Sequence, residues 1–223
     1  MSTKSFAERL GAAVAPNQDQ QSHRAIEALI DAVDDNDTYR RGHSRRVAAY
    51  ATELARVMGS SASEIALVHL GGLVHDVGKI GVPDWVLQKP GTLTPAELHL
   101  LQLHPIIGAS IISRMADMKS VVPIVLHHHE RWDGAGYPSG LKGVDIPVQA
   151  RMICVVEAFD AITSAGDPTQ MGEPEIHAAL ENLRKGSGKQ FDPLAVEGMH
   201  EAWRNGMLDE PLRSGPPEPT VRL

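Results

Sequence analysis

The chain lacks several features that would place it in a common class of proteins. Among its 223 residues there is one cysteine, Cys154, which excludes an internal disulfide framework and is typical of a reducing compartment. No run of apolar residues approaches the roughly 18 to 20 that a transmembrane helix needs, and the first residues lead into no signal-peptide core. We therefore expect a cytoplasmic protein that would need a partner or another segment to attach to a membrane.

An excess of basic residues is also missing. The chain has 21 Lys and Arg against 28 Asp and Glu, which gives a net charge of −7. Such a chain has no general positive field to attract duplex nucleic acid or an anionic membrane. A ligand that carries phosphate must therefore be held by local metal ions or local Lys and Arg, and a small ligand is favoured over a long polyanion.

The alternation of apolar and polar residues that indicates β-strands is not sustained anywhere, and no internal repeat is found. Apolar residues recur instead with helical spacing almost throughout, so we expect an all-α fold. One domain is expected over residues 22–208. A polar N-terminal arm (1–21) and a proline-rich C-terminal tail (209–223) would flank it.

Local signals predict where the first helices begin and end. An apolar stripe with a period of 3.6 residues runs from Val47 to Met58, and Gly59 is placed to end that helix. Ser63 with Glu64 predicts the start of the next helix, which leads towards His75. The chemistry of His75 is therefore expected near the end of a helix.

Further helices are predicted later in the chain. The Thr94-Pro95-Ala96-Glu97 run is a helix start with proline at the first helical position, and we expect that helix to carry His104 just before Pro105. Another helix is expected from about Ser120 into the triple histidine. The segment 149–164 is again helical, after a glycine-rich loop over 133–147.

Histidine is concentrated in one part of the chain, because eight of the eleven histidines lie between His43 and His129. A single histidine is more often structural than a ligand. We expect a structural role for the five that lack an inward carboxylate neighbour or lie off the apolar face, namely His69, His99, His127, His177 and His200.

Seven other residues fall at inward positions or helix ends on separate helices: His43, His75, Asp76, His104, His128, His129 and Glu157. Two octahedral divalent ions need several nitrogen and oxygen ligands and one carboxylate that can bridge them, and Asp76 is the natural bridge. No cysteine joins the set, which argues against structural zinc. The sequence therefore predicts a metal-dependent hydrolase with two divalent metal ions.

Several motifs carry a resemblance to a known family. The chain resembles an HD-GYP domain, the branch of the HD phosphohydrolase superfamily whose members hydrolyse cyclic di-GMP. The matching residues are His43-Ser44-x-Arg46-Val47, the run from His75 to Asp84, Lys89-Pro90-Gly91-x-Leu93-Thr94, His104-Pro105, the run from His128 to Pro138, Gly140-Leu141, Ile146-Pro147, the run from Phe159 to Ser164, and Phe191-Asp192-Pro193. They span about residues 40 to 200.

The resemblance implies an HD-type helical bundle that holds a pair, sometimes a trio, of iron, manganese or similar ions; zinc, nickel and magnesium stay open. It implies that His43, His75, Asp76, His104, His128 and His129 are ligands. Asp76 would bridge the metals and help to hold the water that they activate. Lys79 would contact substrate phosphate, whereas the alternative is a solvated surface lysine.

The loop from Gly134 to Pro138 is the second part of the resemblance. Its residues Gly134, Gly136, Tyr137 and Pro138 would line the substrate entrance, and the loop would also contact a diguanylate cyclase (GGDEF) partner. The alternative is a plain surface turn, which glycine and proline alone would explain. Trp132 and Tyr137 would stack on a base or, as the alternative, anchor the loop.

The chain departs from the family pattern at three places. Glu157 stands where the family has its final metal-binding aspartate, and Asp160 on the same helix face is an alternative ligand. Two basic residues that hold substrate phosphates in the family are absent from the Ala165–Thr169 stretch, at Gly166 and Thr169; each lost contact removes about 1.5 to 3 kcal/mol of binding. Tyr39 replaces the glutamate of trinuclear members, so two metals are expected.

The expected function is hydrolysis of cyclic di-GMP to linear pGpG, with a second cleavage to GMP left open. Two alternatives stay open as well. One is a degenerate domain that binds metal or nucleotide and acts through protein contacts of its loop. The other is a phosphohydrolase of another nucleotide. The sequence also leaves open whether the chain forms a homodimer.

Overall fold

The structure is a computed structural model that describes residues 27–28, 30–31, 42–164 and 173–208. Within these ranges the secondary structure is helical, with no β-strand and one isolated bridge between Ser187 and Phe191. The predicted all-α fold is therefore confirmed. The predicted arm (1–21) and tail (209–223), together with Tyr39 and the Ala165–Thr169 stretch, lie outside the described residues.

The described residues form α-helices joined by short 3-10 helices. In chain order they are α3 (His43–Val57), α4 (Ala62–Val74), η1 (Val77–Gly81), α5 (Asp84–Leu87), α6 (Pro95–Leu101), α7 (His104–Ile112), η2 (Ala116–Met118), α8 (Val122–His127), η3 (Gly143–Asp145), α9 (Val148–Thr163), α10 (Glu173–Gly186) and α11 (Pro193–Arg204).

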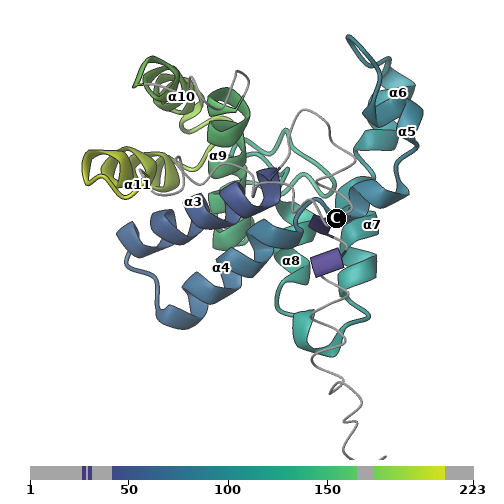
Figure 1. Ribbon diagram of the computed structural model, residues 1–223, viewed down its shortest axis with the longest axis horizontal. Coiled ribbons are helices and arrows are strands. Elements are labelled where there is room, and N and C mark those ends of the chain that lie inside the picture. Colours follow the sequence, from purple (N-terminus) through teal and green to yellow (C-terminus); the bar gives the residue numbers. More distant parts are fainter. Residues whose placement is uncertain (1–26, 29, 32–41, 165–172, 209–223) are drawn as a thin grey trace, which may run out of the picture.

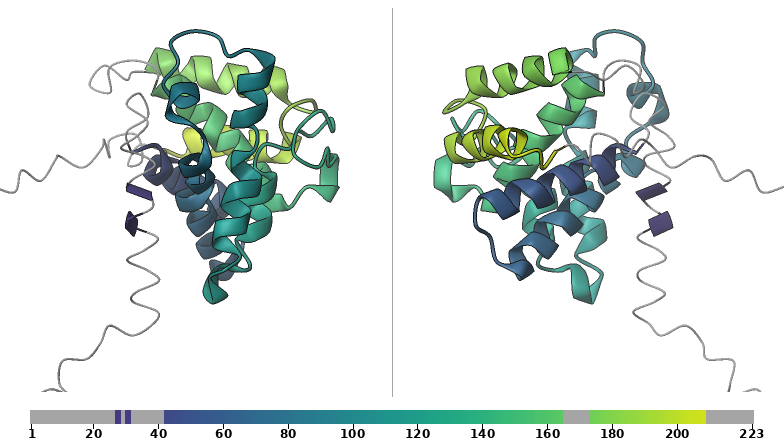
Figure 2. Two further views of the ribbon diagram at one scale, coloured as in Figure 1. Left: turned by 90° about the vertical axis from the view of Figure 1, so that its right-hand side faces the viewer. Right: turned by 60° about the vertical axis from the view of Figure 1, so that its left-hand side comes forward.

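Helices α3, α4 and α9 form the centre of the bundle. Helices α3 and α4 lie side by side, and α9 packs against both of them. On one side α10 and α11 pack against α9 and against each other, and α11 also packs against α3, as the views in Figures 1 and 2 show. On the other side α8 packs against α4, α7 and α9. Segments from both halves of the sequence therefore meet around α9.

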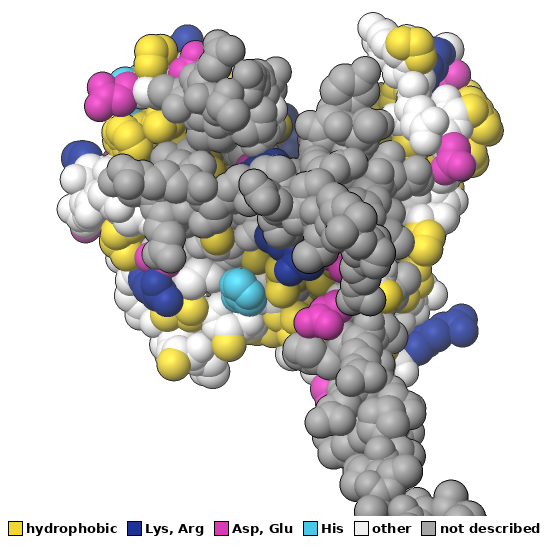
Figure 3. Space-filling model, in the orientation of Figure 1, with side chains coloured by type: hydrophobic (Ala, Val, Ile, Leu, Met, Phe, Trp, Pro, Cys, Tyr) yellow, Lys and Arg dark blue, Asp and Glu magenta, His cyan; other side chains and the backbone are white. Residues whose placement is uncertain are grey.

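Helices α5 and α6 project from the bundle and pack against each other (Figure 1). The Lys89 ammonium group lies 2.6 Å from Oε2 of Glu97 and closes the turn between them. Trp85 and Leu98 are exposed on this projection, where hydrophobic side chains are visible at its surface in Figure 3. Over the face in Figure 3, acidic and basic side chains are interspersed in the described part.

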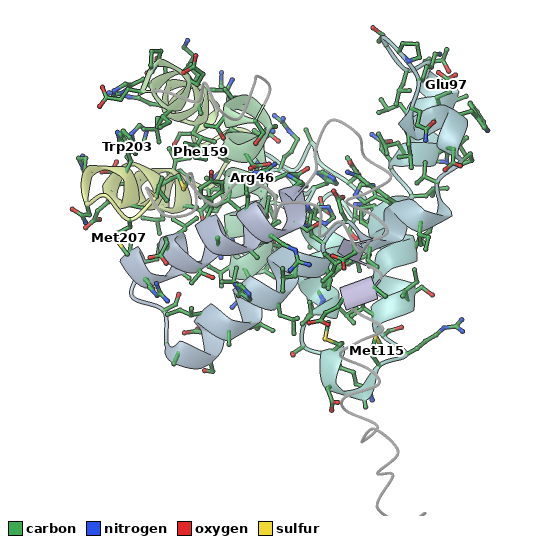
Figure 4. The ribbon with its side chains drawn as sticks, viewed as in Figure 1. Arg46, Glu97, Met115, Phe159, Trp203 and Met207 are labelled. Carbon is green, nitrogen blue, oxygen red and sulfur yellow. The ribbon has the colours of Figure 1, made fainter. Side chains whose placement is uncertain are left out.

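The apolar core has two parts. The larger part joins α3, α9, α10 and α11 around Tyr50 and Phe159, whose rings meet edge to face at 5.2 Å. Figure 4 places Phe159 and Arg46 in the region where α3 meets α9. The smaller part lies under the far end of α4 and includes Val74, Val77 and Val125. His75 and Asp76 lie between Val74 and Val77 in the sequence, so this part of the core flanks them at the C-terminal end of α4.

Two helix starts show how the sequence sets helix boundaries. Thr94 and Glu97 form the predicted capping box at the start of α6. Helix α4 begins at Ala62, because Ser61 and Glu64 form its capping box. The prediction is therefore wrong in detail, because the capping serine is Ser61, two residues before Ser63.

The prediction that the helix from Thr94 carries His104 is also wrong. Helix α6 ends at Leu101, and His104 is the first residue of α7. Pro105 explains the break, because a proline has no N–H to donate and its ring clashes with the carbonyl group four residues earlier, here that of Leu101. The break turns the chain at the point where His104 enters the site.

Among the described residues, no helix combines the length and the apolar character that crossing a membrane requires.

Candidate metal centre

His43 is the first residue of α3 and is held in place by a carboxylate from α9. Its Nδ1 atom lies 2.6 Å from Oδ2 of Asp160. The Nε atom of Arg46 lies 2.7 Å from the other oxygen of the same carboxylate. All three side chains are buried. Since Asp160 accepts the Nδ1–H of His43, the Nε2 atom of that imidazole is left to bind something else.

Three further imidazoles are fixed in a common way, each by a backbone carbonyl three residues earlier. The Nδ1 atoms of His75, His104 and His128 lie 2.7 to 2.8 Å from the carbonyl oxygens of Gly72, Leu101 and Val125. These histidines follow the ends of α4, α6 and α8, where the last carbonyl groups of a helix have no intrahelical partner. Each Nδ1–H donates to its carbonyl, so each Nε2 carries a free lone pair.

Asp76 lies between these imidazoles and turns its two oxygens to different sides. Oδ2 is 3.5 Å from Nε2 of His75 and 3.8 Å from Nε2 of His43. Oδ1 is 3.3 Å from Nε2 of His104. A carboxylate in this position can serve two groups of ligands at once.

The seven predicted ligand residues fall into two groups. One consists of His43, His75 and Glu157, and the other of Asp76, His104, His128 and His129. Within each group, one ligand atom from each residue lies within 4.8 Å of the others. The cluster therefore could bind metal, and the residue types are those that divalent ions such as iron and manganese accept.

The polar atoms at the centre of the cluster also fit a metal. Nε2 of His43, Nε2 of His75 and Oδ1 of Asp76 are buried without a hydrogen-bond partner among the described residues. Unpaired buried polar atoms are costly and rare in proteins. Nε2 of His104 and Nε2 of His128 lie 3.3 Å apart, close enough for both lone pairs to face one ion.

Burial keeps His128 and His129 in the neutral form that a metal needs. Burial lowers the pKa of His128 well below its usual value, and the neighbouring His129 adds to the shift. Burial likewise lowers the pKa of His129 to about 3. At neutral pH these rings carry lone pairs rather than charge.

Lys79 contacts the central carboxylate. Its Nζ atom lies 2.5 Å from Oδ2 of Asp76. Burial raises the pKa of Asp76, but the ammonium group of Lys79, with smaller contributions from the neighbouring histidines, outweighs burial and holds this pKa well below its usual value. Asp76 is therefore ionised at neutral pH.

The cluster opens to solvent on one side. The side chains of His129, Glu157 and Lys79 are 22%, 14% and 15% exposed, whereas that of Asp76 is 3% exposed. The ring of Tyr137 lies 4.9 Å from that of His129 on this open side. A ligand would therefore reach the cluster past these four side chains.

Gly78 explains the spacing of the His75-Asp76-x-Gly78 motif. A Cβ atom at this position would lie 1.9 Å from the carbonyl oxygen of His104 and 2.5 Å from the nitrogen of Gly108. Only glycine lets η1 lie this close to α7. The close approach brings Asp76 next to His104.

Trp132 is an anchor of its loop. Its backbone N–H donates to the carbonyl oxygen of Gln190 at 3.0 Å, and the guanidinium carbon of Arg151 lies 5.6 Å from the centroid of its ring. The predicted substrate-binding residues Gly134, Gly136 and Pro138 lie in the same loop, and a Cβ atom on Gly134 would lie 3.3 Å from Cβ of Lys142. Of the two interpretations of Trp132, the geometry favours the anchor.

Two residues near the site were missed by the sequence reasoning. Glu130 is buried, and its carboxylate accepts the N–H groups of Ser139 at 2.7 Å and Leu141 at 3.1 Å. Arg46 belongs to a matching motif, but the sequence does not show that it binds Asp160. One feature of the sequence could have pointed to Glu130, because it is an acidic residue directly after the triple histidine.

The five histidines expected to be structural stay outside both groups. His69 pairs with Thr52 at 3.0 Å, and the ring of His177 meets that of Trp203. Asp160, the alternative to Glu157 as a ligand, also lies outside the groups and binds His43 and Arg46 instead.

Comparisons with known proteins give relatives for most of the chain. Residues 27–194 match the family model described as HD domain. A cyclic di-GMP phosphodiesterase of Thermotoga maritima is 38% identical over 165 residues, which are 73% of this chain and 44% of that protein. A 3'3'-cGAMP-specific phosphodiesterase of Vibrio cholerae is 34% identical over 187 residues, which are 82% of this chain and 35% of that protein. The chain spans less than half the length of these curated relatives.

Solved structures share the fold. A cyclic GMP-AMP specific phosphodiesterase of V. cholerae has a TM-score of 0.67 at 19% identity, covering 85% of this chain and 50% of that one. A Bdellovibrio bacteriovorus protein described as an HDG"Y"P protein has a TM-score of 0.58 at 23% identity, covering 75% of this chain and 53% of that one. The predicted resemblance and the HD-type helical bundle are therefore confirmed.

Proposed function

Since this chain belongs to the HD domain family, we propose that it is a metal-dependent phosphodiesterase that hydrolyses cyclic di-GMP to linear pGpG. GMP would be the product of a second cleavage. The phosphodiesterase names of the relatives support the reaction class. A cytoplasmic location stays a prediction from the single cysteine.

One observation carries this proposal: Asp76 belongs to one ligand group, and its carboxylate also faces the other group. Oδ2 of Asp76 faces His43 and His75, and Oδ1 faces His104. Two divalent ions, with iron or manganese favoured over zinc, nickel or magnesium, would supply an activated water and offset charge on the phosphodiester. His43, His75 and Glu157 would hold one ion, and His104, His128 and His129 the other.

The residues of the chain would act on the substrate from the open side of the cluster. Asp76 would bridge the two ligand groups and accept a hydrogen bond from the attacking water. Lys79 would contact a substrate phosphate, because its ammonium group lies at Asp76 and its side chain reaches solvent. Tyr137 and the glycines of its loop would line the entrance.

The substrate is proposed as cyclic di-GMP, and a cyclic GMP-AMP dinucleotide is the second candidate because of the V. cholerae relative. Both carry two phosphodiester groups in a ring, so either would fit the same metal chemistry. Gly166 and Thr169 carry no charge, so Lys79 would contact the substrate phosphates without the two basic residues that the family has at these positions.

Contacts with other proteins are a further part of the proposal. A GGDEF domain would dock on the loop that carries Gly134 to Pro138, where Ala135, Ser139 and Gly140 are exposed. A homodimer stays a prediction. Pull-down of a GGDEF domain with wild-type protein and with an Ala135→Arg variant would test the docking, and equal recovery would contradict it.

The test of function is a turnover assay with manganese or ferrous iron, in which the release of linear dinucleotide from cyclic di-GMP and from cyclic GMP-AMP is followed by chromatography. We expect pGpG from cyclic di-GMP. Asp76→Ala and His75→Ala should lose activity together with bound metal, whereas Lys79→Ala should lose activity and keep its metal.

Other outcomes would point elsewhere. Full metal loading without turnover, together with binding to a GGDEF domain, would indicate a degenerate domain that acts through protein contacts. Turnover of other phosphoesters alone would indicate a phosphohydrolase of another nucleotide. Retention of all bound metal by Asp76→Ala would contradict the bridging role.

A further inference from the structure

His129 is oriented differently from the other imidazoles of the cluster. His43 donates Nδ1–H to Asp160, and His75, His104 and His128 donate to backbone carbonyls. In the described part of the chain, the nearest acceptor recorded for Nδ1 of His129 is Oε2 of Glu157 at 3.7 Å, which is beyond hydrogen-bond length. Something other than such a hydrogen bond must fix this ring.

Ring contacts surround His129 instead. The ring of Tyr137 lies 4.9 Å away and is inclined by 30°. The centroids of the His104 and His128 rings lie 4.9 and 4.1 Å from that of His129. The N–H of Tyr137 also donates to the carbonyl oxygen of His129 at 3.3 Å. Tyr137 therefore touches both the main chain and the ring of this residue.

The loop is built so that Tyr137 cannot easily leave this position. The buried carboxylate of Glu130 accepts two N–H groups from the far side of the loop, those of Ser139 and Leu141. A Cβ atom on Gly136 would lie 2.4 Å from the nitrogen of Arg131 and 2.6 Å from Cα of Glu130. The loop thus folds directly back onto residues 129–131.

We infer that Tyr137 is a positioning residue for His129, and that Glu130 holds the loop that carries it. The inference rests on the proposed metal site, because it assigns to the aromatic ring the role that a hydrogen bond has at the other imidazoles. The planar face of Tyr137 would set the direction of Nε2 of His129. The hydroxyl group of Tyr137 would have no part in this.

The direct test measures Mn²⁺ affinity by competition with a fluorescent chelator, with metal content as a second readout. Loss of an outer-shell partner weakens metal binding by about 10- to 100-fold. We expect about tenfold weaker binding in Tyr137→Ala, and also in Glu130→Gln, which places an amide against one of the two N–H groups. Tyr137→Phe keeps the planar face and should bind as tightly as the wild type.

Controls separate a local effect from loss of folding. Val144→Ala changes an exposed residue of η3, outside the loop from Gly134 to Pro138, and should leave Mn²⁺ affinity unchanged. Circular dichroism checks that each variant is folded. If Tyr137→Ala is unfolded, Tyr137→Leu replaces it, because leucine fills the space without a planar face, and the same weakening is expected.

The outcomes distinguish this inference from the proposed function. A wild-type chain that binds no Mn²⁺ would overturn the metal site and the inference together. Wild-type binding with equal affinity in folded Tyr137→Ala or Tyr137→Leu would overturn the inference alone. Weakened binding in Tyr137→Phe would also overturn it, since the hydroxyl group would then be the part that matters.

Discussion

Asp160 is a buried carboxylate that supports the candidate metal site without being one of its ligands. It accepts Nδ1–H of His43 and pairs with Arg46, so it fixes the direction of an imidazole that belongs to the cluster. Glu157, three residues earlier on α9, lies within the cluster. One helix face thus carries a candidate ligand and the residue that orients another ligand.

Asp160→Asn is expected to weaken metal binding and to lower thermal stability. The amide still occupies the space, but Arg46 loses its buried counter-charge, and removal of one partner from a buried pair costs about 3 to 5 kcal/mol. Mn²⁺ affinity and the melting temperature are the measurements. Asp133→Asn breaks the more exposed pair with Arg131 and is the control. Equal effects in both variants would contradict the role of Asp160.

Substitutions at Glu157 test whether it is the last ligand. Glu157→Gln removes the charge and should lower metal affinity by about tenfold or more, because an amide oxygen is a much weaker ligand than a carboxylate for these ions. Glu157→Asp restores the residue that the family has and should keep bound metal. Elemental analysis of both variants gives the answer, and full metal content in Glu157→Gln would show that this residue is not a ligand.

The thiol of Cys154 gives a prediction for pH dependence. Burial raises the pKa of this thiol to about 12, and the carboxylate of Glu157 adds to the shift. In the unfolded chain the pKa of a cysteine thiol is about 8.5. Because the folded pKa is the higher one, this group's contribution to stability is full below that pH and is lost as the pH rises towards the folded value.

Alkylation by iodoacetamide at pH 8 checks the state of Cys154. The folded protein should react far more slowly than the protein in urea, because the thiol is buried and protonated. Equal rates in the two conditions would show that the thiol is accessible in the native state.

At the scale of secondary structure, helix ends deliver the ligands. The chain leaves α4 at His75, leaves α8 at His128 and breaks between α6 and α7 at His104. Carbonyl groups at these helix ends accept hydrogen bonds from the Nδ1–H groups. Each helix end therefore orients the histidine side chain that follows it. A proline at 105 and a glycine at 78 fix two of these turns.

Many of the helices and their boundaries were predictable from the local sequence. The capping box at Thr94 and Glu97 and the apolar stripe from Val47 to Met58 act within one helix, and their spacing alone predicts them. The break before His104 was missed because the helical spacing continues across it. The Asp160 partnership and the Glu130 clamp were missed because each joins segments that only the folded chain brings together.

Gly78→Ala tests the contact between η1 and α7. The added Cβ atom would meet the backbone of His104 and Gly108, which cannot move aside as a flexible side chain would. We expect a lower melting temperature, with a cost of about 1 to 3 kcal/mol for overpacking, and weaker metal binding as Asp76 moves from His104. Ile80→Ala, at an exposed position of η1, is the control and should change neither. Normal metal binding in Gly78→Ala would contradict this account of the spacing.

At the scale of the whole molecule, the cluster lies where two apolar cores meet. The larger core joins α3 to α9, α10 and α11, and the smaller one lies along α4, α7 and α8. Ligand residues come from both sides, so bound metal would tie the two parts of the bundle together. A protein of this kind should be more stable with metal than without it.

Metal removal is therefore expected to lower the melting temperature. A ligand that binds only the folded state stabilises it by about 2.7 kcal/mol when present at 100 times its dissociation constant. Thermal melts after treatment with EDTA and after addition of Mn²⁺ measure the difference. The Asp76→Ala variant should show a much smaller response, and an equal response there would place the stabilising metal elsewhere.

Anomalous diffraction from crystals loaded with Mn²⁺ tests the central claim, a metal centre bridged by Asp76, most directly. The account predicts two anomalous peaks on either side of the Asp76 carboxylate, one beside His43, His75 and Glu157 and the other beside His104, His128 and His129. A single peak, or two peaks without the Asp76 carboxylate between them, would contradict it.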